Sequence, residues 1–312
     1  MRMAGEEKTL MKEDILKYIF DRSVTQKKRI EKVFSAKPEM ELELENFLKT
    51  YKPFMENKSV CFEDLAEAYL SVVNQMIVSR IKFIRTGQYP ASSQEDAAKN
   101  IYSDEKAMTR YMLGLALSQF LWAHHYKVFK FYQDILAYPG KRGAILEVGS
   151  GHGLFTIEFL NKNGIFDSMD IVDISEASLD ITRSIIKTLK PDNIGRINFL
   201  RHDIKQFTAK KLYDFITMGE VLEHVEDPLG ILRHLHRILN DEGTIFVSTC
   251  ANSPAVDHVY HFKSIPQIRA MINGAGFEIV KDIVVPSEDK TESEIEKLKL
   301  DVLYAALIKK SG

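Results

Sequence analysis

The chain has 312 residues, 45% of them hydrophobic, with a formal net charge of -2 and a pI near 6.5. This length allows one large domain or two unequal ones, and the balanced charge disfavours a protein that wraps nucleic acid through phosphate contacts. The only two cysteines, Cys61 and Cys250, show no metal-ligand spacing, which argues against a structural zinc or a disulfide framework.

Two features bear on location. No uninterrupted apolar stretch approaches the ~20 residues that span a bilayer. Residues 1–16 are charged and lack the apolar core of a secretory signal. We therefore expect a cytoplasmic protein without membrane insertion.

Residues 1–137 are expected to form a helical region. Apolar residues recur at three- and four-residue intervals from Phe62 to Thr86, as on one face of a helix. A second long helix is predicted from Ser103 to about Leu136, because a serine and early acids satisfy free N–H groups at a helix start. The breaker-rich residues 138–143 then mark a boundary.

Residues 138–312 alternate short β-rich runs with helical segments. Strands are predicted at 144–148, 168–174, 196–203, 213–219 and 243–250, and helices at 155–163, 177–190, 227–239 and 264–276. This alternation predicts an α/β fold with a doubly wound, mostly parallel, seven-stranded sheet. Two final strand-like runs, 276–285 and 301–310, predict an antiparallel hairpin at its edge, joined by a charged connection over residues 287–299.

A glycine-rich turn, Gly149-Ser-Gly-His-Gly153, follows the first predicted strand. Ligands in such sheets bind at the carboxyl ends of strands, and glycines let the backbone approach a ligand closely. A dinucleotide turn has the spacing G-x-G-x-x-G, but here Leu154 stands in the sixth position. The spacing therefore disfavours a nicotinamide or flavin dinucleotide, and with it a dehydrogenase.

Acidic residues follow the next strands. Asp173 could accept hydrogen bonds from ribose hydroxyls, or it could cap the helix that begins near Ser175. Asp203 could accept from an adenine amino group, with the Ile204 N–H meeting the ring, or it could be an exposed turn residue. The fourth strand leads into Val221-Leu-Glu-His-Val-Glu-Asp-Pro228.

These motifs resemble the class I S-adenosylmethionine-dependent methyltransferases, and they are most similar to the small-molecule branch that includes ubiquinone-biosynthesis O-methyltransferases. The resemblance covers roughly residues 140–312. It implies S-adenosylmethionine as cofactor and S-adenosylhomocysteine as product. The cofactor-binding residues that it implies are Glu147, Gly149, Ser150, Gly151, Gly153, Asp173, Ile174, Asp203, Ile204, Met218, Gly219 and Glu220. The first acid is more often an aspartate in that family.

Methyl transfer is an in-line displacement that needs positioning and often the removal of a proton. His258 and His261 are the candidate catalytic bases, because a neutral histidine accepts a proton near pH 7. The alternative is that both are packing or surface residues. No third ligand is evident beside them, so no metal is expected. We expect His224 to order the loop beneath the cofactor.

Trp122, His125, Tyr126 and Tyr260 are candidate substrate-binding residues. The helix that carries the first three could form a lid, or it could be buried against other helices or a second subunit, which makes a homodimer a reasonable expectation. The expected acceptor is a small molecule, methylated at a hydroxyl oxygen. A protein or carrier-bound substrate, or a non-catalytic regulatory homologue, stays open. Methylation of a nucleic-acid base is disfavoured, because Gly219-Glu-Val-Leu replaces the proline-aromatic motif that holds a flipped base.

Overall fold

The computed structural model describes residues 11–91, 93–97, 105–137, 143–163 and 166–312. The predicted helix cap Ser103 and most of the predicted boundary, residues 138–142, lie outside this part of the chain. Among the described helices, none combines the length and apolar character that crossing a bilayer requires.

Seven strands form one sheet in the order β3-β2-β1-β4-β5-β7-β6. Their bounds are Ala144–Val148 (β1), Ser168–Asp173 (β2), Ile197–Arg201 (β3), Tyr213–Gly219 (β4), Leu239–Ala251 (β5), Phe277–Pro286 (β6) and Val302–Lys310 (β7). Strands β1 to β5 are parallel, and β7 runs antiparallel to both β5 and β6. The predicted fold class, including the C-terminal antiparallel hairpin, is therefore confirmed.

The register brings the carboxyl ends of the central strands together. Val148, the last residue of β1, lies opposite Val172 of β2 on one side and Met218 of β4 on the other. The segments that follow β1, β2 and β4 therefore lie together at the carboxyl ends of the strands. The glycine turn, Asp173 and the segment after β4 were expected to meet there.

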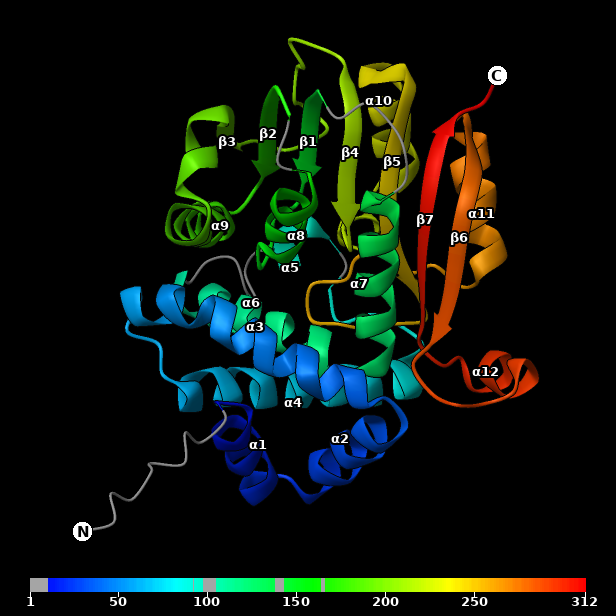
Figure 1. The fold of residues 1–312 in the computed structure, drawn as a ribbon. Helices are drawn as coiled ribbons and strands as arrows, with labels where there is room; N and C mark the ends of the chain where they lie inside the picture. Colours follow the sequence, from blue (N-terminus) through cyan, green and yellow to red (C-terminus); the bar gives the residue numbers. More distant parts are fainter. Residues whose placement is uncertain (1–10, 92, 98–104, 138–142, 164–165) are drawn as a thin grey trace.

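Helices cover both faces of the sheet (Figure 1). The bounds in the second half are Leu154–Lys162 (α8), Glu176–Leu189 (α9), Pro228–Ile238 (α10), Ile265–Gly274 (α11) and Glu292–Leu298 (α12), with 3₁₀ turns at Pro191–Arg196 and Leu222–His224. One apolar cluster joins α8 and α9 to one face, and a second joins α10 and α11 to the other. The helix α12 interrupts the connection predicted over residues 287–299. Its capping box, Thr291 with Glu294, was the overlooked signal.

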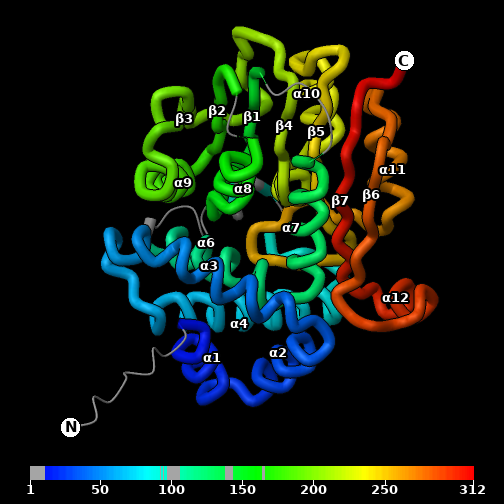
Figure 2. The backbone as a smooth tube through the Cα atoms, in the orientation of Figure 1, coloured from blue at the N-terminus to red at the C-terminus, as the bar shows by residue number. Residues whose placement is uncertain are grey.

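Most of the N-terminal helices lie beyond the carboxyl ends of the parallel strands, whereas α7 runs alongside the sheet (Figures 1 and 2). Their bounds are Met11–Arg22 (α1), Val24–Ala36 (α2), Pro38–Asn57 (α3), Phe62–Thr86 (α4), Gln94–Ala97 (α5), Glu105–Leu121 (α6) and Ala123–Leu136 (α7). The helices α4 and α6 pack on each other, whereas α7 packs on β5, β6 and β7. The N-terminal region therefore roofs the edge where the sequence places the cofactor.

The single helix predicted from residue 103 to 136 is wrong, because the chain is extended at Trp122 (φ -110°, ψ 119°). The indole N–H of Trp122 donates to the hydroxyl of Tyr69 at 2.8 Å, which fixes the turn between α6 and α7. The aromatic residues of this segment point in several directions because they belong to two helices, α6 and α7, which pack against different elements. Phe129 and Tyr132 of α7 are buried within this one chain, so they need no second subunit to cover them.

Candidate functional site

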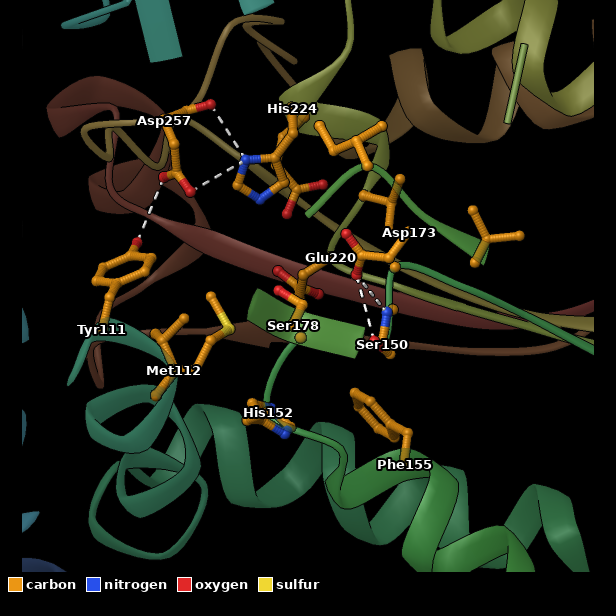
Figure 3. Close-up of a pocket in the computed structure, with 18 of the residues that line it drawn as sticks. Tyr111, Met112, Ser150, His152, Phe155, Asp173, Ser178, Glu220, His224 and Asp257 are labelled. Carbon is orange, nitrogen blue, oxygen red and sulfur yellow. Dashed lines mark hydrogen bonds and ion pairs between the residues drawn. The ribbon is translucent and has the colours of Figure 1, made fainter. Parts of the chain in front are cut away.

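A cavity lies between the carboxyl edge of the sheet and the helical roof (Figure 3). It is lined from both sides, by the loops after β1, β2, β3, β4 and β5 and by residues of α4, α6 and α7. The predicted site residues that line it are Gly149, Ser150, Gly151, Asp173, Ile174, Asp203, Ile204, Gly219, Glu220, His125 and His258. The structure therefore gathers residues of all four cofactor motifs around one space.

The glycine turn has the backbone that its sequence requires. Gly149, Gly151 and Gly153 all have positive φ, at 74°, 49° and 74°. A Cβ on Gly151 would lie 3.5 Å from the sulfur of Met112, on the opposite wall of the cavity. A side chain at this position would thus be strained and would narrow the space, which leaves a cradle that suits close approach of a ligand to the backbone.

Asp173 holds this turn in place. One carboxylate oxygen accepts the Ser150 backbone N–H at 2.9 Å and the Ser150 hydroxyl at 3.3 Å, and the other accepts the Ser175 N–H at 2.8 Å. Burial raises the pKa of Asp173, and these hydrogen bonds oppose that shift. Ser175 caps α9, with its hydroxyl accepting the Ser178 N–H, so the capping alternative for Asp173 is wrong. Asp173 orders the loop before α9 and lines the cavity, and its role toward ribose hydroxyls stays a prediction (Figure 3).

Glu147 lies behind the turn rather than in the cavity wall. It is 1% exposed, the Thr156 hydroxyl donates to its Oε2, and its Oε1 has no hydrogen-bond partner in the described part of the chain. Burial raises its pKa to about 8. Gly153 and Met218 also lie outside the lining. Gly153 caps α8, and Met218 is fully buried in the core beneath α10.

Two glutamates after β4, the half-buried Glu220 and the buried Glu223, form a carboxyl pair. Glu220 has a left-handed backbone (φ 51°), held by its N–H donating to the carbonyl and hydroxyl oxygens of Ser248. Glu223 is fully buried, and its Oε2 accepts the Thr249 hydroxyl at 2.7 Å. Burial, the largest cause for both, raises both pKa values, and the neighbouring carboxyl raises that of Glu223 further. Such perturbed groups beside a cavity are typical of functional sites.

A histidine–aspartate pair completes the other side of the cavity. The Nδ1 of His224 lies 3.1 Å from the backbone oxygen of Asp257 and 3.4 Å from its Oδ2, and the Tyr111 hydroxyl donates to Oδ1 at 3.3 Å. A carbonyl oxygen only accepts, so Nδ1 carries the hydrogen and Nε2 of the neutral ring is left with a free lone pair. In Figure 3 this second nitrogen points away from Asp257.

The two predicted catalytic histidines are placed differently from each other. His258 lines the cavity, but its Nδ1 lies 2.6 Å from the Ser253 carbonyl, and burial lowers its pKa to about 4. His261 does not line the cavity. Its Nε2 lies 2.9 Å from the Asn252 Oδ1, and its ring packs against Tyr89. The sequence located the loop, but it did not indicate which histidine faces the site.

Of the predicted substrate residues, only His125 lines the cavity. Trp122 is directed to Tyr69, and the Tyr126 hydroxyl donates to Glu43 of α3 at 2.9 Å. Tyr260 packs against Phe262. Sequence reasoning missed Tyr111 and Met112 on α6, for which no motif exists. It also missed the contact between His224 and Asp257, which joins two loops.

Donor atoms of Glu223, His224 and His258 lie within 4.8 Å of one another. These three residues form no local motif, because Glu223 and His224 follow β4 while His258 follows β5. Their printed hydrogen bonds to Thr249, Asp257 and Ser253 use Oε2 of Glu223 and Nδ1 of each histidine, so Oε1 of Glu223 and the second nitrogen of each ring stay outside those bonds. These bonds therefore do not exclude a metal, and the expectation of a metal-free site stays a prediction.

Comparison with known proteins gives one family match. The family described as a methyltransferase domain matches residues 121–282. Malonyl-[acyl-carrier protein] O-methyltransferase 2 of Ilyobacter polytropus is 30% identical over 159 residues, covering 50% of this chain and 58% of the relative. A ubiquinone biosynthesis O-methyltransferase of Xanthomonas campestris is 26% identical over 164 residues, covering 49% and 60%. The chain thus matches less than two thirds of the length of these relatives.

Among solved structures, the mitomycin 7-O-methyltransferase MmcR superposes with a TM-score of 0.52 at 12% identity, covering 80% of this chain and 70% of that one. At this identity the likeness concerns the fold alone.

Proposed function

The chain belongs to the class I S-adenosylmethionine-dependent methyltransferases, and we propose that it transfers a methyl group to a hydroxyl oxygen of a neutral, largely apolar small molecule. One observation carries this proposal: a single cavity is lined both by the cofactor motifs and by the His224–Asp257 pair. The cofactor motifs and a candidate proton acceptor therefore share one cavity.

The residues present fit the cofactor. The cradle at Gly151 would accommodate its methionine part, and Asp173 would accept from the ribose hydroxyls. Asp203, whose Oδ1 accepts the Lys205 N–H at 2.9 Å, has a second oxygen for the adenine amino group. When bound, the cofactor supplies a methyl group activated by a positively charged sulfur.

His224 is the proposed general base, in place of His258 and His261. Its Nε2 would take the acceptor hydroxyl proton while the hydroxyl oxygen forms a bond to the methyl carbon. The carbon–sulfur bond breaks, and its electron pair stays on sulfur. Asp257 would hold the ring in the required tautomer and stabilise the imidazolium, and Tyr111 would position Asp257.

The cavity wall indicates the class of acceptor. On the helical side it is formed by side chains that are mostly apolar, namely Met76, Met108, Tyr111, Met112 and Leu115. Methionine adapts its shape to irregular apolar ligands. Among the described lining residues there is no lysine or arginine, whereas Glu220, Glu223 and Asp257 are acidic. A carboxylate acceptor would find no counter-ion among these residues and would lie near Asp257, whereas the raised pKa values of Glu220 and Glu223 favour their neutral forms, so the lining favours a hydroxyl group.

The N-terminal region, residues 1–137, would act as the substrate-binding roof over the methyltransferase domain of residues 138–312. A carrier-bound substrate is the second candidate, favoured by the similarity to a relative named for malonyl-[acyl-carrier protein]. That relative's name alone supports it, and a described cavity lining without lysine or arginine opposes an anionic acyl group.

The test uses two acceptors of matched size, a 4-alkylcatechol and the fatty acid of the same chain length. Each is incubated with the protein and S-adenosylmethionine, and the formation of S-adenosylhomocysteine is measured by mass spectrometry. We expect turnover of the catechol and none of the acid. Turnover of the acid alone would contradict the proposed acceptor. Cofactor binding without turnover of any hydroxyl compound in a metabolite pool would favour the regulatory alternative.

A further inference from the structure

The cavity lining is short of positive charge for the cofactor that it would hold. The methionine part of S-adenosylmethionine carries an ammonium group and a carboxylate at neutral pH. Glu220 can meet the ammonium group, but among the described lining residues there is no lysine or arginine for the carboxylate. A carboxylate that leaves water without a charged or hydrogen-bonding partner is costly to bury. The carboxylate therefore needs a partner among the other lining residues.

Histidines are the lining residues that can supply N–H donors and take up positive charge. His202 lies at the adenine end, directly before the aspartate proposed for the adenine amino group. His224 is the proposed base, and the ring of His258 lies beside it. His125, at the start of α7, and His152, within the glycine turn, remain for the methionine end.

His152 presents a hydrogen-bond donor next to the cradle at Gly151. Its Nδ1 accepts the Leu154 backbone N–H at 3.1 Å, at the start of α8. A ring nitrogen that accepts carries no hydrogen, so the neutral ring has its hydrogen on Nε2. Burial lowers the pKa of His152 to about 4, which makes the ring neutral at pH 7. Figure 3 shows this ring beside the chain that leads into α8, near Met112.

His125 is placed to hold a positive charge on the helical side. The Ser118 hydroxyl donates to the Leu115 carbonyl at 2.7 Å, so it can accept from the His125 Nδ1, which lies 2.9 Å away. The Gln119 amide lies 3.2 Å from the same nitrogen and can turn its oxygen toward the ring. The hydrogen bonds described for His125 all use Nδ1, which leaves Nε2 for a ligand.

The surroundings of His125 keep the ring neutral in the free protein. Burial lowers its pKa well below the ordinary value, and the neighbouring His124 and His152 lower it further. Burial is also the largest cause that lowers the pKa of His124, and the cations Arg29 of α2 and Lys127 of α7 add to it. A carboxylate beside His125 would oppose all of these effects and favour the charged ring.

We propose that His125 and His152 together bind the carboxylate of the cofactor's methionine part, and that His125 takes up a proton from solvent when the cofactor binds. The helix α7 would then contribute to cofactor binding as well as to the roof. This inference rests on the placement of the methionine part at Gly151 that is proposed above. It does not depend on the acceptor. Because the cofactor would occupy both imidazoles, an acceptor carboxylate would still lack a partner.

Calorimetry with two ligands tests the proposal. S-adenosylhomocysteine has the carboxylate, and decarboxylated S-adenosylhomocysteine keeps the amino group but lacks the carboxylate. Each is titrated into the protein at pH 6 in MES and in imidazole buffer, whose different heats of ionisation reveal the number of protons taken up. Glu220 and Asp173 can also exchange protons on binding, but they meet both ligands alike. We expect S-adenosylhomocysteine to take up about half to one proton more than the analogue.

The affinity should depend on pH in the same direction. A histidine that is charged only in the complex favours binding at low pH, and this advantage is lost as the pH rises. From pH 6 to pH 8 the affinity for S-adenosylhomocysteine should therefore fall by about 3- to 10-fold relative to that for the analogue.

Three variants separate the roles of the two rings. His125→Gln keeps a hydrogen-bonding side chain but cannot take up a proton, so the extra uptake should disappear. His152→Ala should weaken S-adenosylhomocysteine by about 10-fold, because it removes a donor to a charged group. Its affinity for the analogue should change by no more than about threefold, which also shows that the variant is folded. His261→Asn, at a position outside the cavity, is the matched control and should keep both the uptake and the affinities.

Equal proton uptake with the two ligands, or extra uptake that survives in His125→Gln, would overturn the proposal. So would a His152→Ala variant that weakens both ligands equally, because His152 would then only shape the glycine turn. These measurements use no acceptor, so a failure of the proposed hydroxyl acceptor would be seen separately, in the turnover assay.

Discussion

Replacing Glu147 with glutamine should change how stability depends on pH. Burial raises the pKa of Glu147 from its ordinary value of 4.5 to about 8 in the folded chain. Below pH 4.5 the carboxyl is protonated in both states. As the pH rises toward 8, only the unfolded chain releases its proton, so the wild type loses stability relative to a variant that has no proton to release.

The magnitude follows from the two pKa values. Each pH unit between them is worth about 1.4 kcal/mol, so at pH 7 the wild type has lost about 3 kcal/mol that Glu147→Gln retains. Glutamine has nearly the same shape and can accept the same hydrogen bond from Thr156. The free energy of unfolding of both proteins is measured in urea at several pH values from 5 to 9, and their difference is compared.

The difference between the two proteins should grow from pH 5 to pH 8 and then become constant. Taking a difference removes the contributions of buried acids whose charges do not act on Glu147, such as Asp301. Glu31→Gln, at an exposed position on α2, controls for the change in net charge. A difference that is the same at pH 5 and pH 8 would refute the reasoning, because Glu147 would then have the same pKa in the folded and unfolded chains.

Four further predictions concern packing, the cofactor, the second histidine and metal. Gly114→Ala should destabilise the protein by about 1 to 3 kcal/mol in urea unfolding, because its Cβ would lie 2.5 Å from the Ala68 carbonyl oxygen across the α4–α6 contact. Gly274→Ala, whose Cβ meets nothing within 4 Å, should not. Asp173→Asn should weaken cofactor binding by about 10-fold or more in calorimetry, since it removes a charged acceptor; an unchanged affinity would contradict its role. His261→Asn should leave turnover within about twofold, whereas a loss of roughly 100-fold would restore it as the base. Dialysis against EDTA should leave turnover unchanged, and a loss restored by added Mg²⁺ or Zn²⁺ would show that a metal is needed.

Much of the fold could be predicted from local patterns. Most strands and helices after residue 144 are short, alternate regularly and are separated by glycine, proline or acidic turns, so periodicity indicated them, with α12 as an exception. The turn after β1 was predictable at the level of single residues, because glycine adopts the positive φ of Gly149 and Gly151 without the steric cost that a side chain adds.

Tertiary geometry accounts for what the sequence did not indicate. The extended residue Trp122 splits a continuous helical pattern, because its indole bonds to Tyr69, more than fifty positions earlier in the chain. Likewise, His258 and His261 look equivalent in the sequence, yet one lines the cavity and the other packs outside it. The His224–Asp257–Tyr111 contacts join three separate elements, and no local spacing could have revealed them.

The most direct test of the account is the turnover number of His224→Gln with a hydroxyl acceptor that the wild type methylates, measured together with the affinity for S-adenosylmethionine. Glutamine keeps a hydrogen-bond donor for Asp257 but cannot hold the acceptor proton. We predict a turnover number lowered by roughly 100-fold or more, with cofactor affinity changed by no more than about threefold. A His224→Gln variant that methylates the same acceptor at the wild-type rate would contradict the claim that His224 is the base.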